Sequence, residues 1–284
     1  MKRAFSSSRI REQEGQQVRV GSSLAGKAVV TAMLFALGGG AAQAGRRCEA
    51  PPPSVQSIER GLVLAQRTAD SLEQAYKEAG TRVVLLARAG QDLTRYQQYW
   101  SHAAWAYRLS QGGWRVVHKL NECKSDQSML VRQGLGDFFL DDLWRYEAVW
   151  HTVPPAWQGN LWNLLQDSAR LRTLHEPRYS MVSYAWGTRY QQSNQWALET
   201  LALAAEPAVR SREHAQAWLK LKDYTPSVLQ IRALTRLGGR MAAGNVAFDD
   251  HPNSQRFADK IETVTADSIF AWLEHLAPGG GGRL

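Results

Sequence analysis

The chain has 284 residues, of which 44% are hydrophobic and 21% charged, so it can bury a large core. Half of its net charge of +8 lies in the first 44 residues, which hold six Lys or Arg and two Glu. Residues 45–284 hold 28 Lys or Arg and 24 Asp or Glu, so their net charge is also +4. No run of five or more like charges occurs, which argues against the concentrated basic face of a nucleic-acid-binding protein.

The first 44 residues have the pattern of a secretory signal. Basic residues precede an apolar run over 28–37, and Ala42-Gln43-Ala44 gives a small-x-small cleavage pattern. The apolar run is shorter than the roughly 20 residues that span a bilayer. We therefore expect cleavage after Ala44 and a periplasmic mature protein. Retention of the segment as an uncleaved anchor is the alternative.

Two cysteines, Cys48 and Cys123, belong to the expected mature chain. An even number of cysteines in an oxidising compartment favours a disulfide between them. The alternative is a free, catalytic Cys123. No CxxC pair or zinc-finger spacing is present.

The N-terminal half predicts a helix followed by an antiparallel sheet. Apolar residues recur at steps of three and four from Ile58 to Ala79, and Gly80 suits a C-cap, which predicts a helix over 54–79. Ser110-Gln111-Gly112-Gly113 is a hairpin signal between two apolar runs. The predicted strands are 82–88, 101–109, 114–120, 129–132 and 146–153, with a turn over 134–140.

The C-terminal half predicts mainly helices. Pro155 suits the first turn of a helix that would run to Leu171. No linker or internal repeat divides the chain, so residues 45–278 are predicted to form a single α+β domain. The other predicted elements are helices over 193–205, 212–221, 227–243 and 266–276, a short strand over 245–248, and a disordered tail over 279–284.

Two polar residues occupy positions typical of acyl-transfer catalysis. Ser193 begins a predicted helix, where the dipole and backbone amides favour an anion, and His102 begins a predicted strand. Hairpin pairing brings His118, Asn121 and Glu122 near His102, so one of them could orient the imidazole. These five residues are the candidate catalytic set.

Each candidate also has a structural interpretation. Serine is among the preferred N-cap residues, His102 fits a structural histidine at a sheet end, and Glu122 fits a solvated loop charge. Asp249-Asp250-His251 could bind a divalent cation. Three consecutive residues rarely face one ion, so a turn is the favoured interpretation, and no metal or other cofactor is expected.

Six segments resemble one bacterial protein family: Val84–Leu93, Ser101–Ala103, Val117–Asn121, Asn194–Glu199, Phe248–Pro252 and Thr263–Thr265. This is the uncharacterised, exported proteobacterial family catalogued as domain of unknown function number 2145. The resemblance extends from Cys48 to Leu276. It implies export and brings no assigned activity.

A weaker resemblance concerns the order of the elements. A buried strand, Ser101-His102 opening a second strand, a hairpin partner and a helix-start residue are similar to the circularly permuted NlpC-type papain-like hydrolases. The resemblance implies a permuted papain-like core with His102 as base, position 193 as nucleophile and a residue within 118–122 as orienter. Serine stands where that family has cysteine, and a hydroxyl ionises far less readily than a thiol.

Two functions therefore stay open. One is a binding or catalytically degenerate relative of amidases and peptidases, with a peptidoglycan peptide or an envelope protein as partner. The other is an active envelope amidase or peptidase that uses His102 and Ser193 on peptidoglycan peptides or a lipid-linked amide.

Overall fold

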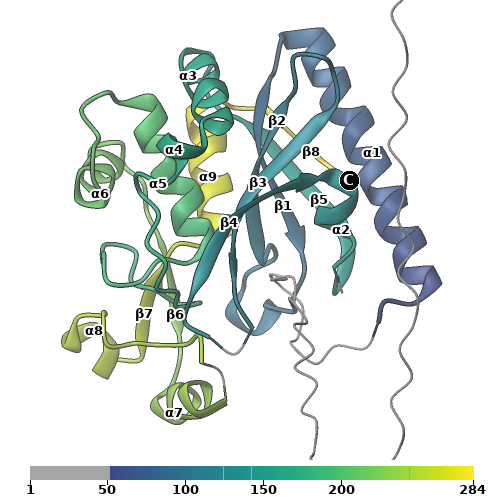
Figure 1. Ribbon diagram of the computed structural model, residues 1–284. Helices are drawn as coiled ribbons and strands as arrows, with labels where there is room; N and C mark the ends of the chain where they lie inside the picture. Colours follow the sequence, from purple (N-terminus) through teal and green to yellow (C-terminus); the bar gives the residue numbers. More distant parts are fainter. Residues whose placement is uncertain (1–51, 124, 142, 243) are drawn as a thin grey trace, which may run out of the picture. The chain divides into compact units, whose positions relative to one another are not determined.

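The computed structural model describes residues 52–123, 125–141, 143–242 and 244–284. Its centre is a sheet with the strand order β4-β3-β2-β1-β5-β8, in which all neighbours are antiparallel (Figure 1). Helices pack on both faces, so the predicted α+β class is confirmed. The predicted signal segment and Cys48 lie outside the described residues. The bond from Cys48 to the exposed Cys123 thus stays a prediction.

Hairpin β2–β3 lies inside the sheet, between β4 and β1. Its turn contains Gly112 and Gly113 with φ of 95° and 79°, a region that favours glycine. Trp105 of β2 lies opposite Val117 of β3, as the hairpin signal predicts. The strands of this sheet are β1 Val83–Ala89, β2 His102–Arg108, β3 Trp114–Asn121, β4 Ser128–Gly134, β5 Arg145–Thr152 and β8 Gly281–Arg283.

One face of the sheet is covered by α1 (Val55–Ala79) and α2 (Leu135–Phe139) (Figure 1). Ser54 caps the start of α1, and Gly80 ends it in the left-handed conformation, as predicted. The two helices approach closely at Gly61, where an added Cβ would lie 2.6 Å from the backbone oxygen of Phe139.

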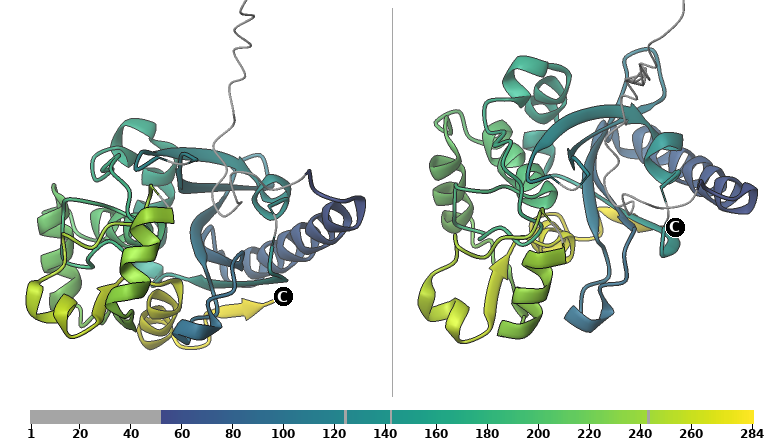
Figure 2. Two further views of the ribbon diagram at one scale, coloured as in Figure 1. Left: turned by 90° about the horizontal axis from the view of Figure 1, so that it is seen from below. Right: turned by 60° about the horizontal axis from the view of Figure 1, so that its bottom comes forward.

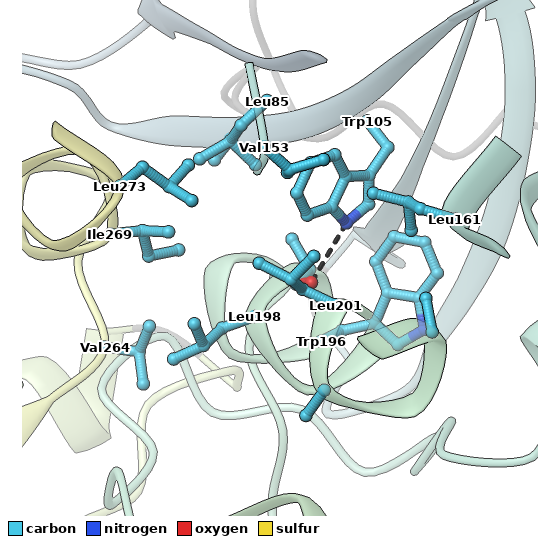
Figure 3. Packing of buried hydrophobic residues seen from close by; sticks show 14 of the residues in the cluster. Leu85, Trp105, Val153, Leu161, Trp196, Leu198, Leu201, Val264, Ile269 and Leu273 are labelled. Carbon is cyan, nitrogen blue, oxygen red and sulfur yellow. Dashed lines mark hydrogen bonds between the residues drawn. The ribbon is translucent and has the colours of Figure 1, made fainter. Parts of the chain in front are cut away.

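The opposite face carries the larger core. Helices α3 (Pro155–Gln166), α5 (Ser193–Ala205) and α9 (Ala266–Leu276) pack there. Figure 3 shows the side chains of this core around Trp105, whose indole Nε1 donates to the backbone oxygen of Ala197 at 2.9 Å. Eleven of the thirteen residues of α5 are buried, so this helix lies inside the protein on nearly every side.

A smaller two-stranded sheet of β6 (Ser227–Gln230) and β7 (Lys260–Thr263) lies beside the main one (Figure 2). Leu229, Ile231, Phe248 and Ile261 form a separate apolar cluster at this sheet. The remaining elements are α4 Ser168–Leu171, α6 Arg212–Leu221, α7 Ala233–Ala242, α8 Asn253–Phe257 and the 3-10 turn η1 Thr94–Tyr96. Among the described residues, no helix combines the length and the apolar character needed to span a bilayer.

Three predictions about local elements are wrong. The predicted turn over 134–140 contains α2, which begins after Gly134, where the Asp137 carboxylate accepts from the Gly134 amide. The helix predicted over 155–171 divides into α3 and α4, because the Asp167 carboxylate caps a new start. The strand predicted over 245–248 is irregular chain, and the carbonyl of Asn245 accepts from the Met181 amide instead.

Two further predictions fail because partners distant in sequence decide the outcome. The helix predicted over 227–243 is β6 followed by α7, since 227–230 pair with β7, which the sequence did not reveal. The predicted tail disorder is also wrong, because Gly281–Arg283 pair with β5 as strand β8. A Cβ on Gly281 would lie 2.7 Å from the Trp150 carbonyl oxygen, so glycine permits this close pairing.

Gly61→Ala tests the close approach of α1 and α2. We expect it to lower the free energy of unfolding by about 2 kcal/mol, because the new methyl group forces the backbones apart. Gly159→Ala, also inside a helix but with no atom within 4 Å of the new Cβ, is the matched control and should stabilise by up to about 1 kcal/mol. Urea unfolding measures both, and equal effects would contradict the packing described.

Candidate functional site

A pocket of about 220 Å³ lies where the start of α5, the segment before β2 and the β6–β7 sheet meet. Its walls are largely apolar and include Tyr96, Trp100, Val182, Leu229 and Phe248. None of the described residues that line it is Asp, Glu, Lys or Arg. His102 and Ser193 are both among the residues that line it.

The imidazole of His102 lies on the α2 side of the sheet. Side chains alternate along a strand, and Ala103 and Trp105 pack with the α5 core, whereas Ala104 packs with α1 and α2. The His102 side chain is on the same face as Ala104, and the centroid of its ring lies 6.0 Å from that of Phe138 in α2. Helix α5 therefore packs on the face of β2 opposite the His102 ring.

His102 is hydrogen-bonded to His118, as the hairpin geometry predicts. The distance from His102 Nε2 to His118 Nδ1 is 2.7 Å, and both side chains are buried. Burial, with the nearby Arg88 cation, lowers the pKa of His118 to about 3. Burial, followed by His118 and Arg88, also lowers the pKa of His102 well below its usual value. The two rings are therefore neutral and share one N–H between them. Because His102 Nε2 is hydrogen-bonded to His118 Nδ1, it is not available to another group.

Ser193 is also engaged elsewhere. Its hydroxyl donates to the backbone oxygen of Lys119 at 2.8 Å, and Tyr179 Oη lies 3.5 Å away. The residue that caps α5 is Gln192, whose side-chain oxygen accepts from the Asn194 amide at 3.0 Å. The interpretation of Ser193 as the N-cap is therefore wrong by one residue.

Asn121 and Glu122 stand apart from this pair. Asn121 ends β3 opposite Ser128 of β4, and its side-chain amide reaches the Glu122 carbonyl at 3.4 Å. Among the described residues, neither side chain bonds to His102. Of the three predicted orienting residues, His118 alone contacts His102.

The sequence analysis missed a buried ionic network behind Ser193. Lys119 is fully buried, and its Nζ donates to Gln191 Oε1 at 2.9 Å and to the Glu176 carbonyl. The Gln191 amide nitrogen donates in turn to Glu199, which is also fully buried. Arg212 donates to both oxygens of Glu199, at 2.7 and 3.1 Å. Gln191 thus connects a buried amine to a buried carboxylate.

Lys119 links this network to helix α5. Burial, and after it the Arg212 cation, lowers the pKa of Lys119 to about 6, although Glu199 and Glu176 oppose the shift. The backbone carbonyl of the same lysine accepts the Ser193 hydroxyl. A single lysine therefore joins the network to the first turn of α5.

The Asp249-Asp250-His251 segment is a turn, as favoured from its sequence. Asp249 pairs with Arg189 at 2.9 Å, Asp250 accepts from the Tyr184 amide, and His251 donates to the Val182 carbonyl. Asp250 and His251 also lie 3.7 Å apart. In the part of the chain that the structure describes, no group of three or more His, Cys, Asp or Glu is arranged to hold a metal ion.

Comparison with known families identifies the chain's relatives. Residues 75–273 match the model of DUF2145, described as uncharacterized protein conserved in bacteria. The chain belongs to this family. No curated protein and no solved structure matches the chain.

Lys119→Met tests the buried amine. An unfolded lysine keeps its proton to about pH 10, whereas folded Lys119 loses it near pH 6, so between these values the unfolded chain binds more protons. The free energy of unfolding should therefore rise with pH in this window, by up to about 1 kcal/mol per pH unit from this group. Lys119→Met should remove this rise.

Urea unfolding between pH 6 and 10 measures the effect. Lys77→Met, on the exposed surface of α1, is the matched control for loss of an amine. Parallel curves for wild type and Lys119→Met would show that the buried site does not perturb this lysine.

Proposed function

We propose that the chain is a ligand-binding, catalytically degenerate relative of envelope amidases and peptidases. The observation that carries the proposal is the engagement of both would-be catalytic groups. His102 Nε2 is bonded to His118, and the Ser193 hydroxyl donates to the Lys119 carbonyl. The pocket beside them is open, apolar and about 220 Å³ in volume.

Attack by a serine requires a base about 3 Å from its hydroxyl, placed to remove the proton. The hydrogen of Ser193 instead points to a backbone carbonyl, which is too weak a base to remove it. A lowered pKa also makes the His102 imidazole a weaker base than an ordinary histidine. The arrangement favours binding without hydrolysis.

The cellular setting of the proposal comes from the sequence. The basic and apolar pattern of residues 1–44 supports export to the periplasm. The order of His102 before the helix-start residue supports descent from an NlpC-type hydrolase. An envelope component, either a peptidoglycan peptide or a protein, is then the class of partner.

An active amidase or peptidase is the second candidate. One observation favours it: His102 and Ser193 are both among the residues that line the pocket. Turnover would require a rearrangement that breaks the His102–His118 bond and turns the Ser193 hydroxyl away from Lys119.

Purified mature protein, Ser193→Ala, Ser193→Cys and His102→Ala should be compared on peptidoglycan fragments and on ester probes. We expect no turnover by the wild type. Ser193→Ala should lower the free energy of unfolding by about 1 kcal/mol, because a buried hydrogen bond is lost. Activity confined to Ser193→Cys would support a degenerate cysteine site. Wild-type turnover that His102→Ala and Ser193→Ala abolish would establish the serine hydrolase instead.

A further inference from the structure

We propose that the pocket binds a neutral acyl amide, with the apolar chain between the β6–β7 sheet and Trp100 and the amide group at Asn194. This inference rests on the proposed function, since it names the ligand class of the same pocket. Three properties of the pocket support it: the absence of charge in its described lining, its size, and the polar groups that its own fold leaves unpaired.

The charge of the lining excludes ionised ligand groups from the interior. No Asp, Glu, Lys or Arg lines the pocket in the described part of the chain, and His102 is neutral. A carboxylate or an ammonium group placed there would lose its hydration without gaining an ion-pair partner, which is strongly unfavourable. A peptide terminus or an acidic side chain is therefore a poor occupant, and the part of an envelope ligand that enters the pocket must be uncharged.

The size and walls fit a short apolar chain. A cavity of about 150 Å³ that is lined by aliphatic and aromatic residues holds one benzene molecule, with six heavy atoms. By proportion, 220 Å³ holds a ligand of about nine heavy atoms. Leu229, Ile231 and Phe248 supply apolar walls on one side, and Trp100 supplies another.

Asn194 supplies a donor for a ligand carbonyl. Its side-chain oxygen accepts from the Ala103 amide at 2.8 Å, which fixes the orientation of the carboxamide. Its Nδ2 makes no hydrogen bond within the described residues, and Asn194, which lines the pocket, is 7% exposed. The neighbouring polar groups are occupied, because Gln192 bonds to Asn194 and Val264, and Ser193 bonds to Lys119.

Gln98 supplies an acceptor in the same lining. Its Nε2 donates to the carbonyls of Tyr96 and Gln97, whereas its Oε1 is buried and has no partner among the described residues. A buried polar atom without a partner costs free energy that a ligand can recover. The Asn194 donor and the buried Gln98 acceptor would suit the C=O and the N–H of an amide.

The test is an NMR titration of the mature protein with heptanamide, heptanoate and heptylamine, which share the chain and differ in charge. We expect heptanamide to shift the Asn194 side-chain amide and to bind at least tenfold more tightly than both charged probes. Asn194→Asp keeps an oxygen for the Ala103 amide but loses the donor. It should weaken heptanamide binding at least tenfold.

Two variants in β6 test where the apolar tail of the ligand binds. Leu229→Lys puts a charge into the pocket and should abolish binding, whereas Val228→Lys, on the exposed side of the same strand, should leave it unchanged. Thermal unfolding checks that Leu229→Lys is folded, and Asn194→Asp provides the test if it is not.

The possible results separate the two proposals. Equal or tighter binding of a charged probe, no binding of heptanamide, or an unchanged affinity in Asn194→Asp would overturn the acyl-amide inference and leave non-hydrolytic binding standing. Release of heptanoate from heptanamide by the wild type, lost in His102→Ala, would instead overturn the proposed function.

Discussion

The burial of helix α5 against β2 and β3 is the constraint on which the rest of the site depends. A buried helix start must satisfy its polar groups inside the protein, because water does not reach them. Here Gln192 caps the helix, Ser193 donates to the Lys119 carbonyl, and Asn194 accepts from Ala103. Glu199, one turn further along, brings in the Gln191 and Arg212 side chains. The polar groups at the base of the pocket therefore hold the fold together.

This constraint supports the proposal that a site with the residue order of a hydrolase binds a ligand without hydrolysing it. His102 opens β2 and Ser193 opens α5, in the order expected of a papain-like enzyme. Helix α5, however, packs on the face of β2 opposite the His102 ring, which pairs with His118 beside Phe138. Among the described residues that line the pocket, the Asn194 amide and the Gln98 side-chain oxygen are available to a ligand, and the walls carry no charged side chain. Those groups suit recognition better than proton transfer.

Local sequence patterns predicted much of the fold. The predicted helix over 193–205 matches α5, and 212–221 and 266–276 match α6 and α9, because caps and apolar periodicity act within a few residues. The contact between His102 and His118 followed from the hairpin. The β6–β7 sheet and strand β8 did not, since each depends on a partner distant in sequence. The sequence also did not show which face of β2 each side chain occupies, because the strand is buried on both faces and lacks an alternation of polar and apolar residues. The burial of Lys119 and Glu199 was not predicted either, because their partners Gln191 and Arg212 lie on other segments.

The most direct test of this account is the ionisation state of the His102–His118 pair. Nitrogen NMR of labelled histidines reports the protonation and tautomer of each ring. The account predicts that both rings are neutral at pH 6.5, where an ordinary histidine is half protonated, with one N–H shared between His102 Nε2 and His118 Nδ1. A His102 ring that titrates near its ordinary value of about 6.5, or that is hydrogen-bonded to the Ser193 hydroxyl, would contradict it.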